Sequence, residues 1–94
     1  MEKQTVVRIM AIRVNSSCPI FRTGDVFYIR KHCFDLSENS LTKYCYHALH
    51  DLYDVFARVR KGAVGNKEVF KCRDNGIVEF EVERLPDEYY SYER

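Results

Sequence analysis

One stretch near the middle of the chain, residues 40–62, has the periodicity of an amphipathic helix. Its apolar side chains recur at steps of three and four residues, the spacing that places them on one helix face. They are Leu41, Tyr44, Cys45, Ala48, Leu49, Leu52, Phe56 and Val59. A helix with one apolar face needs a second layer to cover that face, so the rest of the chain must supply it.

Short strands flank this helix on both sides. The sequence predicts strands at 5–14 and 26–30 before the helix, and at 67–72 and 77–85 after it. The first of these strands has apolar residues at both its even and its odd positions, and therefore on both faces, which is typical of a central strand. The polar segment 31–39 is expected to be irregular. The prediction is therefore an α+β fold in β-β-α-β-β order, with a four-stranded antiparallel sheet packed on one main helix.

The last two strands form a hairpin whose register decides where Cys72 points. A two-residue turn would place Phe70 and Cys72 opposite glutamates. A three-residue loop at 74–76 pairs Cys72 with Val78 and Phe70 with Phe80. We expect the second register because it buries the apolar side chains, and a one-residue slip would turn every one of them to the other face.

A chain of 94 residues fits a single domain. We place this domain at residues 1–86. The segment 87–94 after Pro86 is rich in tyrosine, and we expect a mobile tail there.

The formal charge of +1 argues against a dedicated nucleic-acid-binding protein. A basic group could contact RNA, but the glutamates of the last strand offset its charge. This group comprises Arg58, Arg60, Lys61, Lys67, Lys71 and Arg73. The absence of a long apolar run argues against a membrane span, and we find no secretory leader. We therefore expect a cytoplasmic protein whose four cysteines are thiols.

Three of the cysteines occupy places that a fold of this kind could bring together. Cys18 follows the first strand, Cys45 lies in the first turns of the helix, and Cys72 ends the third strand. A thiol near a helix N-terminus ionises more readily because the helix dipole favours the thiolate. These residues are therefore candidates for a thiol site or a metal site. The alternative is that Cys45 and Cys72 are small core residues, a common role for free cysteine.

The histidines of the helix are a weaker signal. His47 and His50 each precede an aspartate by four residues, Asp51 and Asp54 respectively, so each pair can meet on the helix surface. A histidine beside a carboxylate can act as a base, and His-x-x-His can hold a metal. The simpler alternative is a solvated helix face with weak ion pairs. Of the two, His50 is the better candidate because it lies closer to the apolar face.

These cysteines, with their neighbours, resemble a family of short, uncharacterised prokaryotic proteins. The shared pattern is Cys-Pro at 18–19, Gly-Asp at 24–25, Cys-x-x-Ala-Leu-His at 45–50, and a later cysteine, here Cys72. The chain departs from it at Tyr46 and Arg73, where the family has prolines. The resemblance implies a site made of Cys18, Cys45 and Cys72 that draws in His50, and it implies no activity.

Two functions of different classes follow, and the sequence leaves open whether the chain is an enzyme. The first is a cysteine-lined site for thiol redox or sulfur chemistry or for metal binding, with His50 as a base or fourth ligand. Its partner would be a small molecule or a metal, and no cofactor is indicated. The second is a non-catalytic protein-interaction module. It would form a homodimer through an edge strand or bind a protein through its tyrosines.

Overall fold

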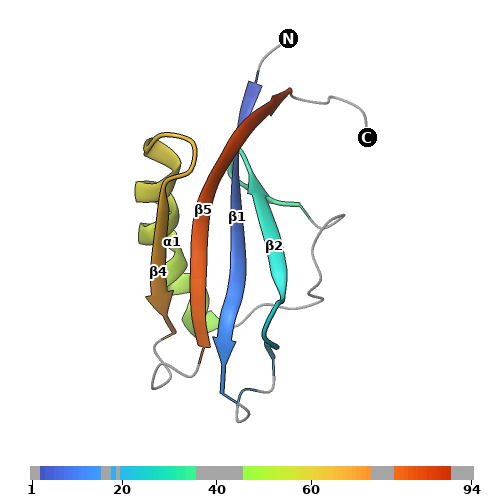
Figure 1. The fold of residues 1–94 in the computed structure, drawn as a ribbon, viewed down its shortest axis with the longest axis vertical. Coiled ribbons are helices and arrows are strands. Elements are labelled where there is room, and N and C mark those ends of the chain that lie inside the picture. Colours follow the sequence, from blue (N-terminus) through green and yellow to red (C-terminus); the bar gives the residue numbers. More distant parts are fainter. Residues whose placement is uncertain (1–2, 16–17, 19, 36–45, 73–77, 90–94) are drawn as a thin grey trace.

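The computed structural model of the chain describes residues 3–15, 18, 20–35, 46–72 and 78–89. Within them it places one helix on one antiparallel sheet of five strands, in the order β3-β2-β1-β5-β4 (Figure 1). The elements are β1 (Lys3–Val14), β2 (Val26–Arg30), β3 (Cys33–Phe34), α1 (Tyr46–Lys61), β4 (Lys67–Lys71) and β5 (Val78–Tyr89). The α+β class is confirmed. In the described part of the chain, no helix is long and apolar enough to cross a membrane.

The predicted strand count and order are wrong because they leave out β3. This strand follows β2 after two residues, so that Ile29 pairs with Phe34 and Arg30 with Cys33. The turn requires a positive φ at Lys31, which is 62°. Glycine usually occupies such a position, and a two-residue strand has no alternation to detect. The order is therefore β-β-β-α-β-β.

β1 is the central strand, as its two apolar faces predicted. It pairs with β2 on one side and with β5 on the other, antiparallel in both cases. Val7, Ile9 and Ala11 are buried in the core shared with α1. Val6, on the opposite face of the sheet, is buried as well.

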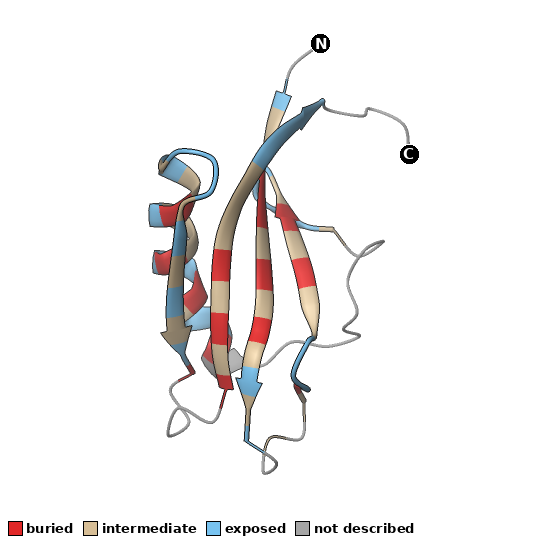
Figure 2. Ribbon diagram, in the orientation of Figure 1, coloured by how far each residue is buried: buried red, intermediate tan, exposed pale blue. Residues whose placement is uncertain are grey.

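The buried stripe of α1 is rotated relative to the predicted one. Ala48, Leu52, Val55 and Val59 are buried and belong to the core cluster that includes residues of the sheet, and Figure 2 shows buried stretches along the helix. The predicted stripe lacked Val55 and included Leu49, which is 42% exposed. The rotation follows from the position of the helix, which packs on β1, β5 and β4. The predicted face also included three residues outside the described part, namely Leu41, Tyr44 and Cys45.

The hairpin register is the predicted one. Phe70 pairs with Phe80, and the backbone N–H of Cys72 donates to the Val78 carbonyl at 2.9 Å. The two phenylalanine rings stack with their centroids 5.1 Å apart. Cys72 is consequently buried in the core, as expected, while the loop at 73–77 lies outside the described residues.

β5 continues past Pro86 to Tyr89, whereas the sequence analysis had the chain leave the sheet at that proline. Glu88 and Tyr89 pair with Gln4 and Lys3 of β1. The register shift between these pairs and the next pair places Pro86 and Asp87 opposite a single residue of β1. Such a bulge tolerates a residue without an N–H, so this proline does not end the strand. The rest of the predicted tail, residues 90–94, lies outside the described part.

Arg84 of β5 holds the end of α1 against the sheet. Its guanidinium donates to the carbonyl oxygens of Arg60 and Gly62, each at 2.8 Å, and to the Asp87 carboxylate at 2.6 Å. The last carbonyls of a helix have no partner within the helix, and they lie at the negative end of its dipole. A cation with several donors satisfies both requirements.

We predict that Arg84→Met lowers the free energy of unfolding by about 1–3 kcal/mol, since it keeps much of the apolar stem and removes charged hydrogen bonds. Urea denaturation measures this difference. Arg13→Met is the matched control. Arg13 is exposed and reaches Glu79 only at 4.0 Å, so its replacement should cost less than about 0.5 kcal/mol. Equal losses in the two variants would contradict the assigned role of Arg84.

Candidate functional site

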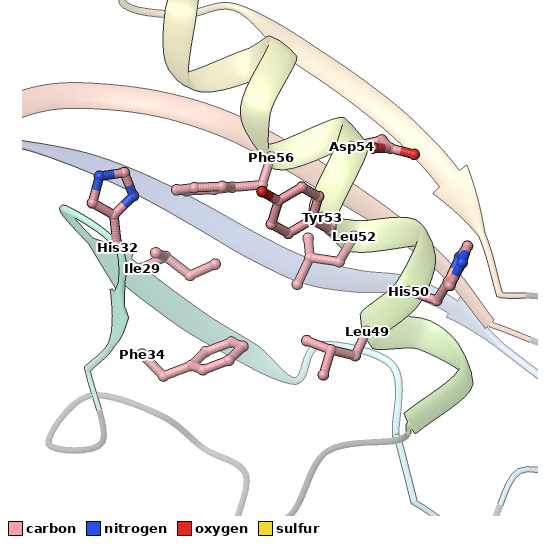
Figure 3. A pocket seen from close by; sticks show the side chains of 9 residues that line it. All are labelled: Ile29, His32, Phe34, Leu49, His50, Leu52, Tyr53, Asp54 and Phe56. Carbon is pink, nitrogen blue, oxygen red and sulfur yellow. The ribbon is translucent and has the colours of Figure 1, made fainter.

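A groove with a volume of about 550 Å³ lies between α1 and the β2–β3 half of the sheet (Figure 3). Its lining is mostly apolar and comes from three elements and the turn between β2 and β3. The lining residues are Ile29, His32, Phe34, Leu49, His50, Leu52, Tyr53, Asp54 and Phe56. A groove of this size and composition falls within the range of sites that bind small ligands or peptide side chains.

The groove exists because one helix is too narrow to cover the sheet. Strands spaced about 4.8 Å apart give a five-stranded sheet a width of roughly 19 Å. A helix with its side chains is only about 10–12 Å across. Because α1 packs on β1, β5 and β4, the side of the sheet formed by β2 and β3 extends beyond it. The chain leaves one wall of the groove after β3 and returns to the other at α1, through residues 36–45, which lie outside the described part.

The floor and the walls of the groove differ in exposure. Leu52 and Ile29 are buried at its base, whereas Leu49 on the helix is 42% exposed and Phe34 on β3 is 39% exposed. Figure 3 shows the Leu49 and Phe34 side chains pointing toward one another from opposite walls. Tyr53, which is 75% exposed, lies beside them on the helix. The structure therefore leaves two apolar walls partly in water with space between them.

The histidine and carboxylate groups of the described lining residues lie at the rim of the groove. His32 marks one end, beside the β2–β3 turn, and His50 and Asp54 lie along the helix (Figure 3). The ring of His50 is exposed, and its Nδ1 lies 3.6 Å from the Asp51 carboxylate, whereas the sequence analysis paired it with Asp54. The side chain of His47 lies outside the described part. Figure 3 shows the His50 and Asp54 side chains directed away from the space between the Leu49 and Phe34 walls, so an occupant would meet mainly apolar surface.

Two of the predicted thiols pack against the same core cluster. Cys72 is only 7% exposed and belongs to that cluster, and the half-buried Cys18 packs against it. The backbone N–H of Phe21 donates a weak hydrogen bond to Cys18 Sγ at 3.5 Å. Figure 1 shows the ends of β1 and β4 and the start of α1 at the same end of the sheet. Cys45, which immediately precedes α1, lies outside the described residues.

Metal ligation finds no support within residues the structure describes, because they contain no group of three or more histidine, cysteine or acidic side chains that could hold a metal ion. Cys33 is exposed on β3, away from the core cluster. His50 lies at the rim of the groove, and its participation in a thiol site stays a prediction. Of the predicted site residues, Cys18 and Cys72 thus lie at the core cluster and His50 lies at the rim of the groove. Cys45 lies outside the described residues.

Two arginines near the end of α1 make contacts within the protein. The Arg58 guanidinium donates bidentate hydrogen bonds to the Glu68 carboxylate, with N–O distances of 3.0–3.1 Å. The Nε of Arg60 donates to Thr5 Oγ1 at 3.1 Å. The hydrogen bond to Glu68, and then the charge of that carboxylate, raise the pKa of Arg58 above its ordinary value. These pairings reduce the charge available to a nucleic acid. Arg73 of the predicted basic group lies outside the described part.

Comparison with known proteins adds no relative. No protein-family model, curated protein sequence or solved structure matches this chain.

The sequence analysis did not predict the groove, although one signal for it was present. Leu49, Tyr53 and Phe56 form a second apolar stripe on α1, beside the buried stripe that ends at Val59. Two stripes indicate a helix that contacts the protein on two sides. The opposite wall gave no such signal, because Phe34 lies in a segment that appeared polar and irregular.

We predict that the thiols react in the order of their exposure, Cys33 before Cys18 and Cys18 well before Cys72. Brief alkylation of the folded chain with iodoacetamide, followed by mass spectrometry of the individual peptides, measures each rate separately. Cys72 should become reactive only after denaturation, because its side chain is enclosed by the core. Alkylation of Cys72 in the folded protein as fast as that of Cys33 would contradict the placement of Cys72.

Proposed function

We propose that this chain is a non-catalytic protein-interaction module that binds an apolar segment of another protein in the groove between α1 and β3. The observation that carries the proposal is the pair of facing, partly exposed walls formed by Leu49 and Phe34. Burying apolar surface contributes about 25 cal/mol per Å². An occupant that fills the space between the walls removes both from water at once.

The shape of the groove favours a peptide segment as the occupant. The helix wall runs from Leu49 to Phe56, a rise of about 10 Å at 1.5 Å per residue. This length accommodates two or three side chains of a bound segment, which is the usual size of an anchor cluster at a protein interface. Tyr53 stands beside this wall with both an aromatic face and a hydroxyl to offer, and tyrosine is enriched among residues that dominate binding.

The experiment selects binders from a displayed library of random twelve-residue peptides, using the intact chain as bait. Selected peptides should contain two or three large apolar residues, and Leu49→Gln should weaken their binding at least tenfold, since one wall becomes polar. Glutamine is a good helix former, so the variant should keep the fold. Isothermal titration calorimetry gives the affinities.

Val64→Gln is the matched control for this experiment. Val64 is an exposed apolar residue in the loop after α1, outside the groove lining, so its replacement should leave the affinity unchanged. Circular dichroism spectra of both variants should match that of the wild type, which would show that both are folded. Peptides that bind the wild-type chain, Leu49→Gln and Val64→Gln equally well would exclude the groove as the binding site.

A thiol site is the second candidate function, favoured by the packing of Cys18 and Cys72 against one cluster. Its chemistry would use thiolates, which bind soft metal ions and attack electrophiles. For this candidate Cys45 would be the third thiol, at the start of the helix, and His50 the base or fourth ligand.

We predict for this candidate that CdCl₂ added to the reduced chain produces the ultraviolet charge-transfer band of cadmium bound to thiolates. The band should be retained in Cys33→Ser, because Cys33 is exposed on β3 away from the cluster. It should be lost in Cys18→Ser and in Cys45→Ser, since each removes a ligand. A band that depends on Cys33 and not on Cys18 would exclude the proposed site.

A further inference from the structure

Among the strands of the described residues, β4 forms an edge of the sheet, and the side of β4 that faces away from β5 has no neighbouring strand. In an antiparallel ladder, residues alternate between those that bond to the neighbouring strand and those that bond outward. The Cys72–Val78 hydrogen bond sets this alternation, so Phe70 and Glu68 also bond to β5. The backbone N–H and C=O groups of Lys67, Val69 and Lys71 therefore point to the open edge.

The side chains of the three outward-bonding residues lie on one face of the sheet and are exposed. Val69 is 51% exposed and stands between Lys67 and Lys71. The pairing between β4 and β5 shows that acidic side chains are compatible with these three residues, because their partners on β5 are Glu83, Glu81 and Glu79 in that order. Opposite charges across a strand pair stabilise the sheet, whereas like charges directly opposite destabilise it.

This arrangement of charges disfavours pairing of the β4 edge with a second copy of the chain in the register centred on Val69. Antiparallel pairing of two β4 edges about Val69 would place Lys67 of one copy opposite Lys71 of the other, and would do so twice. Both contacts are repulsive. Lysines on an edge strand are a common protection against self-association, and they leave the edge open to a strand of the opposite charge.

We propose that the β4 edge binds an extended acidic segment of another protein, which adds a strand to the sheet. The register defines the motif, which is two carboxylates four residues apart with an apolar residue midway between them. The carboxylates face Lys67 and Lys71, and the apolar residue faces Val69. Backbone hydrogen bonds to the edge supply affinity, and the two lysines supply selectivity. The groove borders the opposite edge of the sheet, so this site is independent of the proposed function.

The probe is a capped peptide, Thr-Glu-Thr-Val-Thr-Glu-Thr, and its counterpart with lysines in place of the glutamates is the control. Titration of the intact chain by two-dimensional NMR should shift the amides of Lys67, Val69 and Lys71 with the acidic peptide. The lysine peptide should bind at least tenfold more weakly, and added salt should weaken the acidic one. Absence of binding by the acidic peptide at millimolar concentration, or equal binding of the two peptides, overturns the proposal.

Two variants separate edge pairing from binding elsewhere. Val69→Pro removes the outward N–H and leaves the bonds from β4 to β5 intact, so it should abolish binding of the acidic peptide. Val69→Ile keeps that N–H and an apolar β-branched side chain, so it should bind like the wild type. Acidic-peptide binding that survives Val69→Pro overturns the proposal.

Charge reversal tests whether the lysines disfavour pairing with a second copy. In the double variant Lys71→Glu with Glu79→Lys, opposite charges still face each other between β4 and β5, and Lys67 of one copy faces the introduced carboxylate of the other, so the edge becomes self-complementary. Light scattering should show a concentration-dependent dimer for this variant and a monomer for both the wild type and Lys71→Gln. A wild-type dimer that Val69→Pro disrupts would overturn the proposal, since the edge would then accept its own copy.

Discussion

The packing of α1 across β1, β5 and β4 is the constraint on which the rest of this structure depends. Ala48, Leu52 and Val59 lose all or nearly all contact with water there, opposite the buried side chains of the two longest strands. Arg84 fixes the C-terminal end of the helix through two backbone carbonyls. Once the helix is held over this part of the sheet, its width leaves the β2–β3 side uncovered, and the groove is a direct consequence.

The central part of the opposite face of the sheet is covered in another way. Arg8 pairs with Glu83, and Arg30 bridges Glu88 and Asp35, so that charged side chains lie across the central strands. Exposed ion pairs contribute little to stability, but the long stems of arginine cover apolar surface. Val6, which pairs with Arg30 on one side and with Leu85 on the other, is fully buried on this face. The groove results from the limited width of the helix, and the β4 edge results from the position of β4 at the end of the strand order.

The cysteines illustrate how topology can gather residues without assigning them a role. Cys18 and Cys72 lie far apart in the sequence, yet both pack against one cluster because antiparallel strands bring the end of β1 next to the start of β5. Burial at 7% suits Cys72 to the role of a small core residue, while the half-buried Cys18 keeps some access to solvent. A shared cluster is what a thiol site requires, and it is also what an ordinary core requires.

The local sequence determined much of this fold. Helical periodicity located α1, the two apolar faces of residues 5–14 identified the central strand, and the alternation from Val78 to Val82 gave the hairpin register. Each of these is a short-range pattern whose period is set by backbone geometry. Local patterns also misled at two points, since Pro86 lies within a bulge and β3 is too short to show alternation.

Only the tertiary structure decided which side of the helix met the sheet and which strands it covered. Leu49 and Val55 are both apolar residues on adjacent parts of α1, and nothing in their spacing determines which is buried. That choice depends on where the helix lies above the sheet, which is a property of long-range packing between segments distant in sequence. The groove arises from this placement of the helix, and the edge position of β4 arises from the order of the strands. Both depend on how several elements are arranged, so no single segment of the sequence encodes them.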